Sequence, residues 1–268
     1  MALTLLNYLA PFLVGACIGS FLNVCIYRIP LGRSVIHPGS HCAACGSPIP
    51  WQYNIPILGW LLLRGRAACC GTKIDSRYPL VEFITAAAFV ALWNLYPPTP
   101  AWIYILFACG LIIATFIDLD HFIIPDRISL GGCLAGLLLS AVCPELHEKS
   151  TAWQGFLFGC YGLLLGGGLL YAIAVLGSAV LKKDAMGMGD VKFLAAMGAF
   201  LGWQAPLFII MVSSLVGSVF GIALMIRRHK RWGLKIPFGP FLAIAAAVWL
   251  LGGKQWMADY IHYVTSPR

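Results

Sequence analysis

The sequence predicts an all-α, polytopic integral membrane protein. Of its 268 residues, 60% are hydrophobic and only 10% are charged, and the mean hydropathy is +0.85. Apolar runs near the length of about 20 residues needed to cross a bilayer recur along the chain. This composition excludes an ordinary soluble domain and makes the lipid bilayer an expected partner. The net charge of +8 does not indicate nucleic-acid binding, because the basic residues gather in a few loops.

Three segments follow from the order of apolar and polar residues. Residues 1–29 are expected to form a first transmembrane helix, in which Gly15, Gly19 and Ser20 at helical spacing predict a face for close helix packing. Residues 30–78 hold four cysteines and several basic residues, which predicts a small module outside the lipid. Residues 79–268 are expected to form a membrane catalytic domain with seven further helices. Its apolar runs lie at about 79–96, 101–119, 128–143, 154–181, 191–202, 205–226 and 237–252.

About eight spans are thus expected, of which the sixth, 191–202, is short enough to belong instead to a re-entrant hairpin. Fifteen of the 18 Lys and Arg residues lie in four loops that fall on one side of an eight-span protein. Basic loops mark the cytoplasmic face, so both termini are expected on the opposite side. The four loops are 28–78, 120–127, 182–192 and 227–235.

Two carboxylates are expected to meet at this cytoplasmic boundary. Asp118 closes the third apolar run and Asp190 opens the sixth. Ionisable groups at membrane helix ends are costly to desolvate and therefore suggest a functional site. Two nearby carboxylates tend to hold one proton between them, so that one draws a proton from water while the other hydrogen-bonds a substrate carbonyl. Gly187 and Gly189, just before Asp190, would let an extended substrate backbone approach the acid.

Other interpretations of these acids remain open. An Asp at a helix start is commonly a cap or a dipole partner, which is how we interpret Asp126, while Asp120 projects to a different helix face from Asp118. A transporter would use Asp118 and Asp190 for ion or proton coupling, but it predicts inverted repeats and mid-membrane charges that are not evident. An assembly scaffold whose acids are only caps predicts that Asp190→Asn leaves function intact.

Several stretches, in order, resemble the type IV prepilin peptidases, and the resemblance covers nearly the whole chain. They are Gly19–Val24, Tyr27–Pro30, Asn54–Pro56, Arg77–Glu82, Ile117–His121, Ile124–Asp126, Gly187–Asp190 with Lys192, and Pro237–Pro240. The resemblance implies a GxGD-type aspartic protease of the bacterial inner membrane. It further implies Asp118 and Asp190 as catalytic residues at the cytoplasmic face.

The same resemblance implies the substrates and a second activity. Members of this family remove a basic leader from type IV prepilins or type II secretion pseudopilins, cutting after a glycine. The bacterial members are also N-methyltransferases that modify the new N-terminal amine with S-adenosylmethionine as methyl donor. No Gly-rich fingerprint for that cofactor is present in this sequence, so methylation rests on the resemblance alone.

Four cysteines in the polar module are candidate ligands of a structural zinc ion. Cys42 and Cys45 form a Cys-x-x-Cys pair, and Cys69 and Cys70 follow some two dozen residues later. Four thiolates would make a closed tetrahedral site able to hold a small module together. The family pattern has Cys-x-x-Cys twice, whereas here Ala67 stands where the first cysteine of the second pair is expected. Cys69 or His41 would have to substitute; free cytoplasmic thiols are the alternative, and a disulfide is disfavoured on the reducing side.

Overall fold

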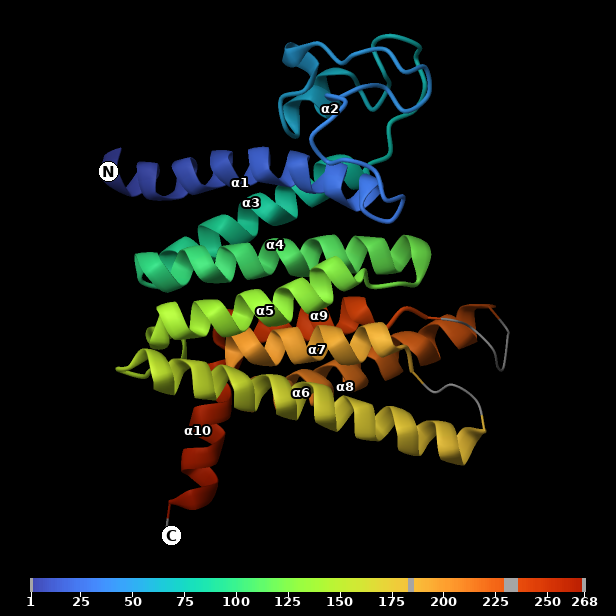
Figure 1. Ribbon diagram of the computed structural model, residues 1–268. Helices are drawn as coiled ribbons and strands as arrows, with labels where there is room; N and C mark the ends of the chain where they lie inside the picture. The colour runs from blue at the N-terminus through green and yellow to red at the C-terminus, as the bar shows by residue number, and fades with distance from the viewer. Residues whose placement is uncertain (1, 183–185, 229–235, 267–268) are drawn as a thin grey trace. The chain divides into compact units, whose positions relative to one another are not determined.

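The computed structural model describes residues 2–182, 186–228 and 236–266, so two of the predicted basic loops fall partly outside the described residues. Within the described residues the chain is all-helical, and isolated β-bridges occur only at His41 with Pro48 and at Arg66 with Lys73 (Figure 1). In the part of the chain that the structure describes, six helical segments are long and apolar enough to cross a membrane, as expected of a multi-pass membrane protein. They are Leu5–Arg28, Arg77–Leu95, Pro98–His121, Ala152–Val180, Gln204–Arg227 and Gly239–Thr265.

The chain divides into two compact units, residues 1–113 and 114–268. In the first unit, α1 (Ala2–Arg28) and α3 (Arg77–Leu95) run side by side (Figure 1). Their backbones touch, since a Cβ atom added to Gly15 would lie 2.7 Å from the Ala86 Cα, and one added to Gly19 would lie 2.7 Å from the Glu82 Cα. The predicted small-residue face on α1 is therefore confirmed.

Between α1 and α3 lies a module with little regular structure, containing η1 (Trp51–Tyr53) and α2 (Leu58–Leu62). Polar contacts fasten its ends. The buried Arg28 guanidinium donates to the carbonyls of Ser34 and Gly39, at 3.1 and 3.3 Å. Buried Asn23 donates through Nδ2 to the Tyr78 carbonyl at 3.1 Å. These side chains give hydrogen bonds to backbone carbonyls, of which those of Ser34 and Gly39 have no partner in a helix or sheet.

The second unit is a helical bundle around α7. Its elements are the end of α4 (Pro98–His121), α5 (Asp126–Val142), η2 (Pro144–His147), α6 (Ala152–Leu181), α7 (Met188–Leu201), α8 (Gln204–Arg228), α9 (Gly239–Val248), η3 (Trp249–Gly253) and α10 (Lys254–Thr265). In Figure 1, α7 lies among α5, α6 and α8, and every residue from Phe193 to Leu201 is buried. Glycines permit this packing, for Gly162 and Gly198 meet backbone to backbone.

Helix α7 is shorter than a typical membrane-spanning helix. Its 14 residues rise about 21 Å, whereas the hydrocarbon core is about 30 Å thick. Helix α5, at 17 residues, is also shorter than the six candidate spans. At the other end of the bundle, Gly252 has a φ of 144°, a conformation that favours glycine, and α10 turns away from the bundle (Figure 1).

A buried polar link ties η2 to α7. The Ser140 hydroxyl donates to the Ala199 carbonyl at 2.9 Å, and the His147 Nε2 lies 2.8 Å from the same hydroxyl oxygen. Because the hydroxyl hydrogen is committed to Ala199, the Ser140 oxygen accepts and His147 donates through Nε2. Burial, with a smaller contribution from the charges of Lys254 and Lys149, lowers the pKa of His147 to about 4.

Candidate active site

Asp118 lies in the last turn of α4, where its side chain is only 5% exposed. The helix ends shortly afterwards because Phe122 adopts a left-handed conformation, with φ 57°, while its N–H still bonds the Asp118 carbonyl at 2.9 Å. The turn directs the chain into a short connection that reaches α5 at Asp126. Asp118 is therefore fixed by the helix on one side and by this turn on the other.

The Asp118 carboxylate is bound by the start of a distant helix. Its Oδ2 accepts the N–H of Gly239, the first residue of α9, at 3.0 Å in a buried contact. The first N–H groups of a helix lack partners within it and carry partial positive charge, so they suit a carboxylate. A Cβ added to Gly239 would lie 2.7 Å from that same oxygen. Only glycine allows this approach without displacing the acid.

Asp190 is the third residue of α7 and is half-buried. Gly187 caps the start of the helix, and its carbonyl accepts the Asp190 N–H at 3.2 Å. A Cβ added to Gly187 would lie 3.7 Å from the Asp190 Oδ2, so the exposed side of the carboxylate borders glycine backbone. Asp118 acts electrostatically on Asp190. The fold thus brings together the two carboxylates, which stand 72 positions apart in sequence.

Ile124 forms an apolar wall beside the pair. It lies in the connection from α4 to α5 and is 7% exposed. A Cβ added to Gly189 would lie 3.4 Å from the Ile124 Cβ, and one added to Gly239 would lie 3.1 Å from its Cδ1. Gly189 on α7 and Gly239 on α9 therefore pack on the same side chain, which lines up the helix ends that carry the site.

Two nearby acids behave differently from the pair. Asp126 is 61% exposed and meets the Lys192 ammonium at 2.7 Å, two residues beyond Asp190. As the first residue of α5 it also lies where an acid favours the helix dipole. Asp120 is exposed, whereas Asp118 is buried. The contacts of Asp126 therefore agree with its interpretation as a residue that stabilises the start of a helix. Asp118 and Asp120 do lie in different surroundings.

The four cysteines of the module converge. The sulfur atoms of Cys42, Cys45, Cys69 and Cys70 all lie within 4.8 Å of one another. Three pairs are closer: 3.3 Å for Cys45 with Cys69, 3.7 Å for Cys42 with Cys70, and 3.8 Å for Cys69 with Cys70. A tetrahedral zinc ion with Zn–S bonds of about 2.3 Å separates its sulfur ligands by about 3.8 Å. The donor set and spacing therefore fit one such ion.

Two equivalent turns build this cluster. In the first, the Cys42 N–H bonds the Ser47 carbonyl and the Gly46 N–H bonds the Cys42 carbonyl. In the second, the corresponding bonds join Ala67 with Thr72 and Gly71 with Ala67. Both turns need their glycine, because Gly46 and Gly71 have φ values of 73° and 69°. Ala67 is thus the structural equivalent of Cys42, and Cys69 supplies the fourth sulfur from a different place in its turn.

Two thiols of the cluster are shifted toward the thiolate form, which is the form that binds metal. The Ser47 side chain, followed by its backbone N–H, lowers the pKa of the Cys45 thiol to about 6. Thr72 lowers the pKa of Cys70 in the same way. The pKa of Cys69 is raised to about 12, chiefly because Cys69 shares a hydrogen bond with Cys45. His41 does not belong to the group among the described residues; its Nδ1 lies 2.9 Å from the Gly39 carbonyl.

Comparison with known proteins identifies the family. The Bacterial Peptidase A24 N-terminal domain matches residues 13–96, and the Type IV leader peptidase family matches residues 105–222. The prepilin leader peptidase/N-methyltransferase of Aeromonas hydrophila is 37% identical, over 93% of this chain and 92% of its own. The chain belongs to the prepilin leader peptidase/N-methyltransferase family. Proteins of the same name from Aeromonas salmonicida and Pseudomonas aeruginosa are 36% and 34% identical, over 92% and 93% of their lengths. No solved structure matches.

The two family matches separate the two sites. The leader peptidase match contains Asp118 and Asp190, and the N-terminal match contains all four cysteines of the cluster. Gly239 lies beyond both matches, and sequence reasoning assigned it no role. The sequence does contain a feature that could have drawn attention to Gly239. In Pro237–Pro240, this glycine lies between two prolines at the start of a helix. Ile124 was overlooked in the same way within Ile124–Asp126.

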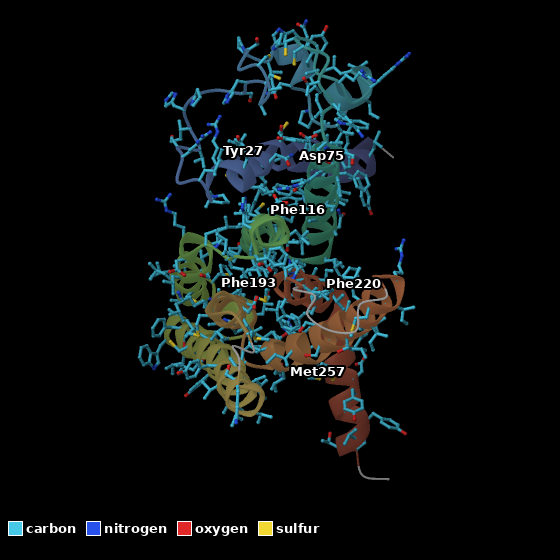
Figure 2. The ribbon with its side chains drawn as sticks, turned by 90° about the vertical axis from the view of Figure 1, so that its right-hand side faces the viewer. Tyr27, Asp75, Phe116, Phe193, Phe220 and Met257 are labelled. Atoms are coloured by element: carbon cyan, nitrogen blue, oxygen red, sulfur yellow. The ribbon has the colours of Figure 1, made fainter. Side chains whose placement is uncertain are left out.

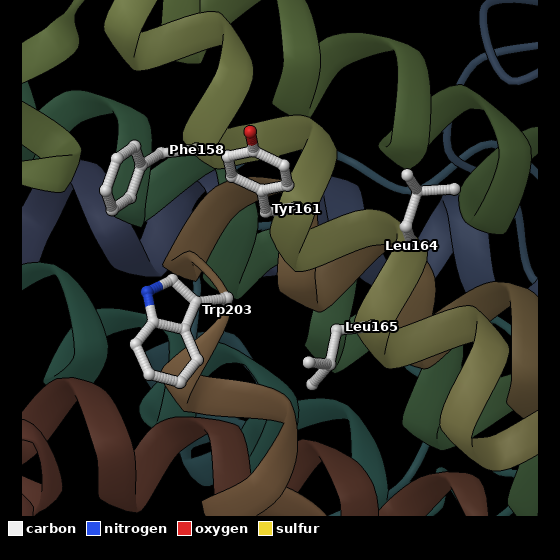
Figure 3. Close-up of a pocket in the computed structure, with 5 residues that line it drawn as sticks. All are labelled: Phe158, Tyr161, Leu164, Leu165 and Trp203. Carbon is white, nitrogen blue, oxygen red and sulfur yellow. The ribbon is translucent and has the colours of Figure 1, made fainter.

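One further hollow in the second unit has no chemistry of its own. It is a shallow apolar pocket of about 600 Å³ against α6 and the turn from α7 to α8, as Figure 3 shows. Its walls carry neither a carboxylate, a thiol nor an amine, and three of its lining residues, Phe158, Tyr161 and Trp203, are aromatic. Such a surface suits hydrocarbon. The lining residues are Phe158, Tyr161, Leu164, Leu165 and Trp203.

Proposed function

We propose that the chain is an aspartic endopeptidase of the bacterial inner membrane that removes the basic leader of type IV prepilins or type II secretion pseudopilins. The observation that carries this proposal is the meeting of buried Asp118 with the Gly239 N–H beside Asp190. Membership in the prepilin leader peptidase/N-methyltransferase family supports the substrate class. The clustering of Lys and Arg in four loops supports a cytoplasmic active site, an eight-span topology and a cysteine insertion on that side.

The two carboxylates take different parts in hydrolysis. An N–H donor favours the ionised form of a carboxylate, so Asp118 is suited to draw a proton from the attacking water. Asp190 then holds the shared proton and donates a hydrogen bond to the scissile carbonyl. The tetrahedral centre forms by direct attack of water, without an acyl-enzyme. As the bond breaks, Asp118 returns its proton to the leaving amine.

The glycines before Asp190 shape the entrance. Gly187 is exposed and Gly189 is half-buried against Ile124. Without side chains, this backbone lets an extended substrate strand reach the carboxylate. The basic leader stays in the cytoplasm while the following apolar segment lies in the membrane, so the scissile bond falls at the interface.

The name of the relatives supports a second activity, methylation of the new N-terminal amine. S-adenosylmethionine supplies the methyl group in such reactions. The peptidase carboxylates belong to the second unit and to the leader peptidase match. We assign methylation to other residues of this chain.

The cysteine cluster is proposed to hold one structural zinc ion through Cys42, Cys45, Cys69 and Cys70. Support comes from the convergence of four sulfur atoms and from the lowered thiol pKa values of Cys45 and Cys70. Four sulfur ligands leave no open position, which assigns the ion to structure and not to catalysis. The ion would join the two turns of a module with little core.

Cleavage of a prepilin by the purified protein tests the peptidase assignment. Asp118→Asn and Asp190→Asn should each slow cleavage by about a thousandfold or more, and the double variant should be no slower than the slower single variant, because the two acids act as a unit. Asp259→Asn, a matched change on exposed α10, should cleave normally. Near wild-type cleavage by either active-site variant, with normal thermal unfolding, would make that aspartate structural.

Metal analysis of the purified protein tests the zinc assignment. Wild type should carry one zinc per chain, Cys69→Ser should lose it, and Cys69→Ala combined with Ala67→Cys should regain it, because position 67 is equivalent to Cys42. Cys160→Ser, outside the cluster, should retain the metal. A wild-type protein purified in zinc-containing buffer but free of zinc would refute the assignment.

A further inference from the structure

A second cavity lies entirely within the first unit. It measures about 410 Å³ and is bounded by the ends of α1 and α3 and by the cysteine module. Figure 2 labels two of its lining residues, Tyr27 at the end of α1 and Asp75 just before α3. Aromatic side chains of Tyr53, Trp60 and Tyr78 also line it. The cavity therefore combines apolar walls with polar groups, as binding sites for small groups do.

A buried carboxylate forms part of this cavity. Glu82, in the second turn of α3, lines it and is only 8% exposed. The close approach of α1 at Gly19 fixes the backbone beside it, and the neighbouring Ser20 hydroxyl hydrogen-bonds the carboxylate. Glu82 is thus positioned by helix packing and not by a flexible loop. Hydrolysis at Asp118 and Asp190 makes no use of it.

A strained turn is held against the same carboxylate. The Ile57 N–H donates to the Glu82 Oε2 at 2.6 Å. Ile57 has φ 62° and ψ −52°, and the Leu58 N–H bonds the Pro56 carbonyl at 2.6 Å, which defines a γ-turn of the rare, strained kind. A β-branched residue strongly disfavours positive φ. Such strain, kept at a cavity wall, is typical of functional sites.

Glu82 lacks a cationic partner within the chain. Among the described residues, no Lys, Arg or His forms an ion pair with it, and the buried Arg28 in the same cavity donates to backbone carbonyls. A buried carboxylate without a cation is costly. An ionised carboxylate offers about four acceptor positions, of which Ile57 and Ser20 use two. The Glu82 carboxylate can therefore still accept hydrogen bonds from a bound ligand.

We propose that Glu82 binds a primary amine in this cavity and accepts its proton, which makes the cavity the methyl-transfer site. This inference rests on the proposed function, because methylation of a new N-terminus needs a place to hold that amine. An amine arrives largely as ammonium, and its nitrogen becomes nucleophilic only after losing a proton. The Glu82 carboxylate attracts the ammonium and takes this proton, while the aromatic walls favour a cationic group. The amine belongs either to the processed substrate or to the amino group of the methyl donor.

Binding to the full-length protein tests the proposal without relying on turnover. The probes are a synthetic peptide of the mature pilin N-terminus with a free α-amine, the same peptide N-acetylated, and S-adenosylhomocysteine. Wild type should bind the free peptide roughly tenfold more tightly than the acetylated one. Glu82→Gln should lose this preference, and Glu82→Asp, which keeps the charge, should retain part of it. Glu148→Gln, a matched change at an exposed glutamate of the second unit, should behave as wild type.

The outcomes separate the two sources of the amine. If Glu82→Gln weakens the free peptide alone, the amine is that of the substrate; if it weakens S-adenosylhomocysteine alone, the amine is that of the donor. The first result supports Glu82 as the proton acceptor of the methylated amine, and the second supports this cavity as the site that holds the methyl donor. Unchanged binding of all three probes to a variant with normal thermal unfolding would overturn it. A wild-type protein that neither cleaves nor methylates would instead refute the proposed function, whereas normal methylation by Glu82→Gln with an unchanged KM would refute only this inference.

Discussion

The cysteine cluster and the carboxylate pair are held in different ways. The cluster rests on two short turns, and three of its four cysteines are exposed. The pair rests on helix ends, with Asp118 buried and α7 enclosed along most of its length. If the cluster holds the proposed zinc ion, the sulfur site would depend on that ion for rigidity, whereas the carboxylate site depends on packing. Changes to one site should therefore have different measurable effects from changes to the other.

Among changes that keep both aspartates, the largest effect should follow a single methyl group beside Asp118. Gly239→Ala places a Cβ atom 2.7 Å from the Asp118 Oδ2, so the carboxylate must move away from the helix start. Loss of one well-placed donor at a reacting group lowers rates by about a hundredfold or more. We therefore expect kcat for prepilin cleavage to fall about a hundredfold, measured with purified protein.

Gly168→Ala is the matched control, because a Cβ at Gly168 would meet no atom within 4 Å. It should cleave at the wild-type rate. Equal rates for the two alanine variants would show that the Gly239 contact does not serve cleavage.

Chelation should distinguish the two regions next. Removal of zinc should expose the hydrogen-bonded N–H groups of Cys42, Gly46, Ala67 and Gly71 to exchange, because the two turns lose their common anchor. Helix α7 has no such dependence. Amide hydrogen exchange with and without chelator should therefore show faster exchange in residues 42–72 and unchanged exchange in α7. Equal changes in exchange in both regions would contradict the idea that only the cysteine module depends on the metal ion.

Acid should affect the packed region through His147. Its folded pKa of about 4 lies below the ordinary value of 6.5, so the unfolded chain binds more protons between these pH values. The free energy of unfolding should rise with pH across this window and fall on acidification, by about 2 kcal/mol from about pH 7.5 to about pH 5. Denaturant unfolding in detergent can measure this. His147→Gln keeps a donor toward Ser140 and should lose this share of the pH dependence; an identical profile would contradict the assignment.

The smallest effect is expected at the exposed ion pair of Asp126 and Lys192. The side chains are 61% and 32% exposed, so the pair should add less than about 1 kcal/mol to the free energy of unfolding. Asp126→Asn should therefore shift the unfolding midpoint only slightly, with cleavage close to wild type. A large loss of cleavage would place Asp126 in the catalytic site after all.

Much of the fold was accessible from sequence because apolar runs and loop composition act locally. Each of the eight apolar runs contains a helix, and the run from 191, which was expected to be short, forms the 14-residue α7. What sequence did not predict was the burial of α7 among its neighbours, which depends on backbone contacts such as that of Gly162 with Gly198. Such contacts join residues that are far apart in the sequence, and no local sequence pattern shows that they will meet.

The site shows the same limit. Asp118 and Asp190 were predicted as a pair from their places at the ends of apolar runs, and the structure brings them together. Their partner Gly239 was not predicted, because its role depends on where α9 begins in space and not on its own neighbours. Glu82 was not predicted for a similar reason, because its proposed role depends on a cavity that the ends of α1 and α3 and the cysteine module enclose together.

The unequal spacing of the two cysteine turns bears on how such modules are recognised. Ligation requires four sulfur atoms to converge, and Cys69 and Cys70 meet that requirement from adjacent positions. A search pattern that demands Cys-x-x-Cys twice would overlook this chain. A pattern that fixes the turn glycines, Gly46 and Gly71, and accepts a second cysteine at either position 67 or position 69 would find it.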